Sequence, residues 1–164
     1  MWLPDPSAVE AIPLTGDFQF VYAPLPGYPC GFPNMNGIVA TENGKWLIVN
    51  NTVTGQLYRV DPSTGASTQI QLLNDPFGTP YSDGLLLHGD TLYSVANFLS
   101  RIAVIDLAKD LLTGTIEGYV TSPNFDVPAT AAFFGDRIYA VNARFRLDGS
   151  APPGADDDIV QVGR

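Results

Sequence analysis

Two polar residues of the sequence, Asn36 and Asp83, each stand directly before a glycine at the start of a predicted strand. About 45 residues separate them, roughly one period of an internal repeat, so a repetitive fold would carry both to equivalent places. Where equivalent loops of such a fold meet around a channel, these side chains could bind a ligand and take part in its chemistry. Asn and Asp before glycine also form ordinary turns. Both interpretations stay open on the local sequence.

The repeat consists of two strands joined by a short turn, followed by a third strand. Its central strands contain Leu47, Leu92 and Ile138, spaced about 45 residues apart, which lies within the range of propeller blades. Residues 67–72 and 115–120 are predicted outer strands of the first two copies. We therefore predict an all-β fold, a β-propeller of four-stranded blades, with about three blades in this chain.

Composition agrees with an all-β fold and argues against two classes of partner. The chain has 14 prolines, 16 glycines and few helix-favouring residues, which is typical of short strands joined by tight turns. Its net charge of -9, without a basic cluster, opposes binding to a phosphate backbone, so we expect no nucleic-acid partner. No apolar run reaches the roughly 18 residues that span a bilayer. We expect a soluble protein with no membrane partner, and secretion or a periplasmic location stays open.

The chain divides into two predicted regions. Residues 1–16 contain three prolines and are expected to form an extended N-terminal arm. Residues 17–164 are expected to form the three-blade domain, with a strand at 17–23. The third repeat lacks an evident fourth strand, and its loop over 144–158 is longer than its counterparts. A long loop in a compact domain is usually functional or disordered, and this one is predicted to be a lid or an excursion into solvent.

Three blades do not close a ring. Propellers hide their strand edges by closing, typically with about four to eight blades, whereas an open arc exposes edges that invite association. The chain is therefore half of a longer protein, or two copies pair about a twofold axis into a ring of six. We favour the homodimer, in which the strand at 17–23 could complete the partner's third blade.

Several segments carry a resemblance to a known superfamily. They are N-G-I at 36–38, N-G-K-W-L-I-V at 43–49, G-Q-L-Y-R-V at 55–60, S-D-G-L at 82–85 and R-I-Y-A-V-N-A-R-F at 137–145. Together they resemble the superfamily of gluconolactonase, senescence marker protein and luciferin-regenerating enzyme, and the last two fit a bacterial and fungal branch of it. The resemblance covers residues 34–146, which correspond to the C-terminal half of a usual member.

The resemblance implies a metal site. In that superfamily six blades surround a channel holding a divalent cation, usually calcium, bound by a Glu, two Asn and an Asp. Asn36 resembles the second of those asparagines and Asp83 the aspartate, which would also be the catalytic residue. The Glu and the other Asn belong to the half that this chain lacks. Calcium takes about six to eight oxygen ligands, so two side chains are too few, but a twofold pair would supply four.

Further candidates lie at the ends of the second strands, which return to the same face as Asn36 and Asp83. Asn51, Asn97 and Asn142 recur there at the repeat period, and Arg144 follows, so we predict that these four contact a substrate. The alternatives are loop-forming roles for the asparagines and a surface ion pair for Arg144. The function expected is metal-dependent hydrolysis of lactones or similar small esters. A non-catalytic ligand- or protein-binding propeller, or a half-propeller without activity of its own, is the alternative.

Overall fold

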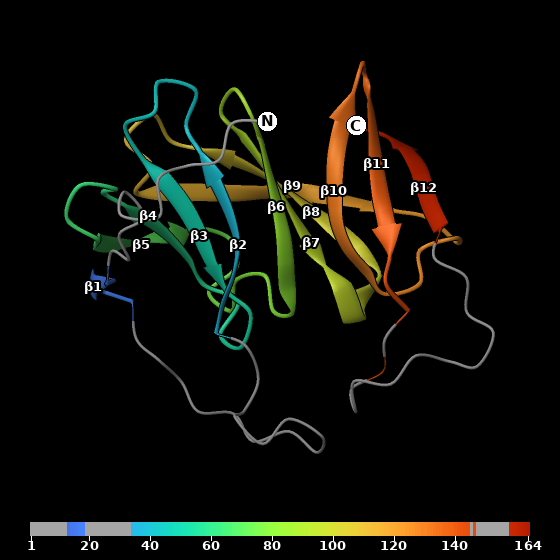
Figure 1. The fold of residues 1–164 in the computed structure, drawn as a ribbon, viewed down its shortest axis with the longest axis horizontal. Coiled ribbons are helices and arrows are strands. Elements are labelled where there is room, and N and C mark those ends of the chain that lie inside the picture. The colour runs from blue at the N-terminus through green and yellow to red at the C-terminus, as the bar shows by residue number, and fades with distance from the viewer. Residues whose placement is uncertain (1–12, 19–33, 145, 147–157) are drawn as a thin grey trace, which may run out of the picture.

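Three antiparallel blades, arranged side by side as an arc, make up the structure, a computed structural model that describes residues 13–18, 34–144, 146 and 158–164 (Figure 1). Blade 1 contains β2 (Met35–Ala40), β3 (Leu47–Asn51), β4 (Leu57–Val60) and β5 (Ala66–Leu72). Blade 2 contains β6 (Ser82–His88), β7 (Thr91–Ala96), β8 (Arg101–Leu107) and β9 (Thr113–Thr121), with a short 3-10 helix, η2 (Asn97–Leu99), between β7 and β8. Blade 3 contains β10 (Pro128–Phe134), β11 (Arg137–Asn142) and β12 (Asp158–Gly163). The all-β prediction and the prediction of three blades are confirmed.

Each blade begins with a hairpin whose turn passes through a glycine with positive φ. These glycines are Gly44, Gly89 and Gly135, with φ of 67°, 58° and 60°. A left-handed backbone costs glycine little, because glycine has no Cβ, so it is the residue that lets the chain reverse within so few positions. The repeat of turn glycines is the local reason that the first two strands of every blade pair.

The innermost strands of successive blades approach each other very closely at one end. A Cβ added to Gly37 would clash with the backbone carbonyl oxygen of Asp83, and one added to Gly84 would lie 2.8 Å from the Cα of Thr130. Neither glycine has the positive φ that would explain it as a turn residue. Glycine follows Asn36 and Asp83 because the next blade leaves no room for a side chain.

Two apolar cores hold the blades together. The first lies between blades 1 and 2, where Ile48 and Leu57 pack with Leu92 and Ile105. The second lies between blades 2 and 3 and includes Val95, Ile102, Ile138, Ala140 and Val160. Successive residues of a β-strand point to opposite faces of the sheet, so alternate residues of a blade pack against the preceding and the following blade. The arc is therefore stabilised from blade to blade rather than around one central core.

In the described part of the chain, strand pairing connects blades 1 and 2 but does not connect blades 2 and 3. Outer strands β5 and β9 pair in parallel at Gln71 with Thr113 and at Leu72 with Gly114, which joins the first two blades into one sheet. Strands β10, β11 and β12 form a sheet of their own. Among the described residues, blade 3 is thus attached to blade 2 by side-chain packing and not by strand pairing.

A segment before the first blade docks on its outer side. The short strand β1 (Thr15–Gly16) pairs in parallel with β5, and the rings of Phe18 and Tyr58 meet edge to face with centroids 5.1 Å apart. Asp17 and Phe18, where the strand at 17–23 was expected to begin, are not in a strand. Asp17 instead accepts a hydrogen bond from the backbone N–H of Gln69, at 3.0 Å, through its carboxylate.

Parts of the predicted organisation fall outside the described residues. They are most of the predicted N-terminal arm (1–12), the remainder of the strand predicted at 17–23, and nearly all of the loop predicted at 144–158. Within the described part of the chain, we find no helix with the length and apolar character needed to cross a membrane.

Candidate functional site

Asn36 and Asp83 lie in β-bulges at the start of the innermost strands of blades 1 and 2. The pairing of β2 with β3 shifts between Met35 and Ile38, and that of β6 with β7 shifts between Ser82 and Leu85. A bulge leaves one residue out of the ladder and redirects its side chain. Blade 3 has a corresponding irregularity between Pro128 and Thr130, where Ala129 stands. Blades 1 and 2 therefore each supply a polar side chain at this position, and blade 3 supplies a methyl group.

Three of the predicted site residues come together at Asp83. The amide nitrogen Nδ2 of Asn97 donates a hydrogen bond to Oδ2 of Asp83, at 3.2 Å, and the side chain of Asn36 also hydrogen-bonds to this carboxylate. Asn97 is buried and begins η2, where its Oδ1 accepts a hydrogen bond from the backbone N–H of Phe98 at 2.7 Å. The structure thus brings Asn36, Asp83 and Asn97 into one cluster, which we call the Asp83 cluster.

The carboxyl group of Asp83 is half-buried, and this determines its acidity. Burial raises the pKa of Asp83 above its ordinary value, because a carboxylate loses hydration there. The hydrogen bonds from Asn97 and Asn36 favour the charged form and lower the pKa, but by less than burial raises it. A carboxylate that has lost hydration, and whose hydrogen-bond donors in the described part of the chain are neutral amides, gains from a cation or a proton.

A buried polar network fixes the backbone beneath the Asp83 cluster, and its central residue is Asn50. The side chain of Asn50 accepts a hydrogen bond from the N–H of Gly37 at 2.8 Å, donates to the hydroxyl of Ser82 at 2.6 Å and donates to the carbonyl oxygen of Asp83 at 2.7 Å. The hydroxyl of Thr52 donates to the carbonyl oxygen of Ser82 at 2.7 Å. Asn50 was not predicted as a site residue. Its neighbour Asn51 was, and the sequence carries no signal that separates the two, because the difference is that Asn50 faces blade 2.

Asn51 stabilises its own loop. Its Oδ1 accepts hydrogen bonds from the backbone N–H groups of Val53 and Thr54, at 3.0 and 3.2 Å, and its Nδ2 donates to Asn34 at 3.3 Å. The side chain is fully buried. This arrangement matches the loop-forming alternative considered for the repeated asparagines.

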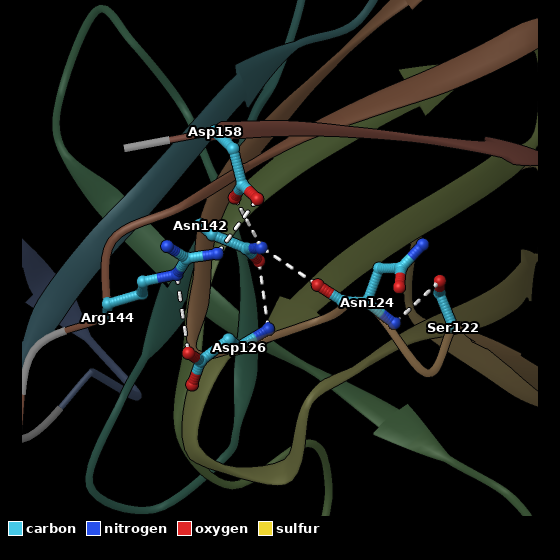
Figure 2. A network of polar contacts seen from close by, with 6 residues as sticks. All are labelled: Ser122, Asn124, Asp126, Asn142, Arg144 and Asp158. Atoms are coloured by element: carbon cyan, nitrogen blue, oxygen red, sulfur yellow. Dashed lines mark hydrogen bonds and ion pairs between the residues drawn. The ribbon is translucent and has the colours of Figure 1, made fainter. Parts of the chain in front are cut away.

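Asn142 and Arg144 belong to a second network, at the end of β11 (Figure 2). Asn142 accepts a hydrogen bond from the N–H of Asp126 at 2.9 Å, and donates to the carbonyl oxygen of Asn124 at 2.9 Å and to Asp158 at 2.7 Å. Arg144 forms ion pairs with Asp126 at 3.3 Å and with Asp158 at 2.8 Å, and lines a cavity of about 530 Å³ beside β12. The charge of Arg144 is therefore already compensated by two carboxylates, as the ion-pair alternative expected.

The oxygen-bearing side chains of the Asp83 cluster are of the kind that binds a hard cation, but they are too few to complete a site. One carboxylate and two amides carry the oxygen atoms that calcium prefers, yet calcium takes about six to eight oxygens. In the part of the chain that the structure describes, no group of three or more His, Cys, Asp and Glu residues is placed to hold a metal. The cluster fits part of a calcium site, and additional ligands would have to come from elsewhere.

Comparison with known proteins bears on the fold. Neither a protein-family model nor a curated protein sequence matches the chain. Solved structures do match it. The luciferin-regenerating enzyme matches with a TM-score of 0.54 and 16% identity, over 80% of this chain and 45% of that one. The chain has a β-propeller fold.

Two further propeller structures match at similar levels. A putative 6-phosphogluconolactonase from Bacteroides uniformis matches with a TM-score of 0.54 and 13% identity, over 87% of this chain and 45% of that one. Hydrazine synthase from Kuenenia stuttgartiensis matches with a TM-score of 0.56 and 14% identity, over 79% and 34%. This chain spans less than half the length of each of the three structures, and identities this low establish the fold alone.

Proposed function

We propose that this half-propeller carries part of the active site of a metal-dependent hydrolase of lactones or similar esters, related to the gluconolactonase superfamily. The observation that supports this most is the Asp83 cluster, in which a half-buried carboxylate with a raised pKa is held by two amides at the entrance of the innermost strands. Carboxyl groups with perturbed acidity that converge with polar groups are typical of catalytic sites.

The residues of the cluster have distinct roles in this proposal. Asp83 and Asn36 would hold a divalent cation, which we take to be calcium. A calcium ion bound there would supply Lewis-acid polarisation of the ester carbonyl. Asn97 donates a hydrogen bond to the carboxylate of Asp83 and so helps to fix its orientation. Asn50 acts through the backbone of Asp83 and is a positioning residue.

The hydrolytic step requires a base, and Asp83 provides it. Water adds to the carbonyl carbon, Asp83 accepts a proton from that water, and the bond between this carbon and the ring oxygen breaks. The leaving oxygen then takes this proton from Asp83, which returns Asp83 to its charged form and yields a hydroxy acid. Burial raises the pKa of Asp83, and a carboxylate with a raised pKa is a stronger base than an ordinary surface carboxylate. Arg144, which lines the cavity beside β12, is the candidate contact to the polar part of a small substrate, and the buried Asn142 supports the loop that carries it.

A non-catalytic binding propeller is the second candidate. The observation that favours it is the donor count, because one carboxylate and two amides on this chain are few for a catalytic cation. In this case the channel face would bind a small ligand or a protein without chemical turnover.

Calcium titration by calorimetry and hydrolysis of small-ring lactones and phenyl esters test the proposal. We expect the purified chain to bind calcium and to hydrolyse at least one lactone. Asp83→Asn should lower turnover by about a hundredfold or more, which is the usual contribution of a general base. Asp136→Asn is the matched control, since Asp136 lies in the exposed turn between β10 and β11. Calcium binding without turnover would favour the binding propeller, and turnover that survives Asp83→Asn would refute the catalytic role.

A further inference from the structure

The last blade of the arc exposes residues that are buried at the same position of the preceding blade. In blade 2, Val95 of β7 pairs with Ile102 of β8, and both are 0% exposed because blade 3 packs on them. In blade 3, Val141 and Ile159 pair at the same register, and they are 36% and 66% exposed. This face of blade 3 is built like a junction between blades, but no described blade covers it.

The first blade shows the complementary feature. In blade 2, Leu85 of β6 pairs with Ser94 and is 8% exposed, because it packs toward Ile48 and Leu57 of blade 1. The equivalent residue of blade 1 is Ile38, which pairs with Val49 and is 57% exposed. Each end of the arc therefore presents one half of the junction that the chain forms twice within itself.

We propose that a second copy of this chain covers both ends and closes a six-bladed ring. Ile38 of each copy packs on the surface around Val141 and Ile159 of the other, and a twofold axis makes the two contacts identical. A second copy is the favoured occupant because its exposed half-junction is the complement of the one it would meet.

Closure would also complete the Asp83 cluster, and this part of the inference rests on the proposed function. The innermost strands β2 and β6 of both copies would face one channel, so each copy would contribute Asn36, Asp83 and Asn97. Asp83 and Asn36 of each copy would supply four oxygen-bearing ligands, because the side chain of Asn97 is engaged with Asp83 and with the N–H of Phe98, and water would supply the remaining oxygens that calcium takes.

The molar mass of the full chain in solution, measured by light scattering over a range of concentrations, tests the ring. We expect twice the mass of the chain. Ile159→Asp should weaken dimerisation by about a hundredfold or more, because it would bury an unpaired carboxylate in an apolar junction. Ile38→Asp and Val141→Asp should act alike. Phe77→Asp is the control, because Phe77 is 80% exposed on the loop between β5 and β6 and takes no part in either half-junction. Circular dichroism verifies that each variant folds.

Mixing two variants distinguishes this geometry from other dimers. In a mixed pair of Ile38→Asp and Ile159→Lys, one junction is unchanged and the other contains opposite charges, so dimers should reappear. A monomeric wild-type chain, or a dimer that neither Ile38→Asp nor Ile159→Asp weakens, would overturn the proposal. Dimerisation without lactone hydrolysis would support the proposed ring and contradict the proposed hydrolase function. Lactone hydrolysis by a monomer would support the hydrolase function and contradict the ring.

Discussion

The side-chain amide nitrogen of Asn50 lies 2.7 Å from the backbone carbonyl oxygen of Asp83, across the junction between blades 1 and 2. A fully buried side chain of one blade thus holds the backbone of the candidate catalytic residue on the next. Because polar groups removed from water must be hydrogen-bonded, the contact fixes the register of the two innermost strands as well as the position of Asp83.

Replacing Asn50 should therefore affect both stability and the site. Asn50→Ala leaves the N–H of Gly37 without its side-chain acceptor and removes two donors, so we expect a loss of about 2–3 kcal/mol in the free energy of unfolding. Urea denaturation measures it. Asn43→Ala is the control, because Asn43 forms its hydrogen bonds in an exposed hairpin turn, and it should cost less than about 1 kcal/mol. Equal losses would contradict the positioning role of Asn50.

Gly37 should tolerate no side chain. The added Cβ of Gly37→Ala would meet the carbonyl oxygen of Asp83, so the innermost strands must separate, at a cost of about 1–3 kcal/mol or more. Gly118→Ala is the control, because Gly118 lies in β9 with open space around it, and a strand gains from alanine there. Thermal unfolding should show a lower Tm for Gly37→Ala and an unchanged or higher Tm for Gly118→Ala. A neutral Gly37→Ala would mean that the strands do not touch.

The raised pKa of Asp83 predicts a pH dependence of stability. In the folded chain Asp83 holds its proton more tightly than in the unfolded chain, whose Asp has the ordinary pKa of 3.8. Stability is therefore lost as the pH rises from 3.8 through the raised pKa, and it stays lower above that. Without calcium, Asp83→Asn should be more stable than the wild type at neutral pH, and this advantage should shrink in acid.

Urea denaturation in chelator across this pH range measures the difference. Added calcium should reverse the order at neutral pH, since a ligand that binds only the folded wild type stabilises it. An advantage of Asp83→Asn that grows toward acid would contradict the direction of the pKa shift.

Arg144 should stabilise blade 3 through charge. Arg144→Ala leaves the carboxylates of Asp126 and Asp158 without their shared cation, and we expect a loss of about 1–2 kcal/mol at low salt. The loss should decrease as salt screens the charges. Arg137→Ala is the control, because Arg137 reaches its exposed partner Asp136 only at 3.7 Å, and it should change stability by less than about 0.5 kcal/mol. Salt-independent losses would indicate lost packing rather than lost charge.

The fold followed from the sequence where local patterns and the repeat agree. Turn glycines such as Gly89 and alternating apolar residues determine hairpins, and the period places them in successive blades. The strand pairs of all three blades were predicted for this reason. The gathering of Asn36, Asp83 and Asn97 was predicted too, because equivalent ends of strands in a repeat meet on one face.

What could not be predicted depends on contacts between distant segments. The roles of Asn50 and Asn51 differ because one faces the neighbouring blade and the other its own loop, which adjacent positions in the sequence do not reveal. Local alternation predicted a strand beginning at Asp17, but the carboxylate of Asp17 accepts a hydrogen bond from the N–H of Gln69, more than fifty residues away, and neither Asp17 nor Phe18 is in a strand. The ion pairs of Arg144 likewise depend on Asp126 and Asp158, which come from two other segments.

The strand pairing between β5 and β9, without an equivalent for blade 3, has a consequence for how the molecule opens. Among the residues that the structure describes, detaching blade 3 breaks no ladder hydrogen bonds to blade 2, so this blade can separate while the other two remain intact. Amide protons of β10, β11 and β12 should then exchange with solvent sooner than those of β7 and β8. Each separation would briefly expose to solvent the valine and isoleucine side chains at the junction between blades 2 and 3. A ligand or protein bound to the opposite face of blade 3 would slow this opening.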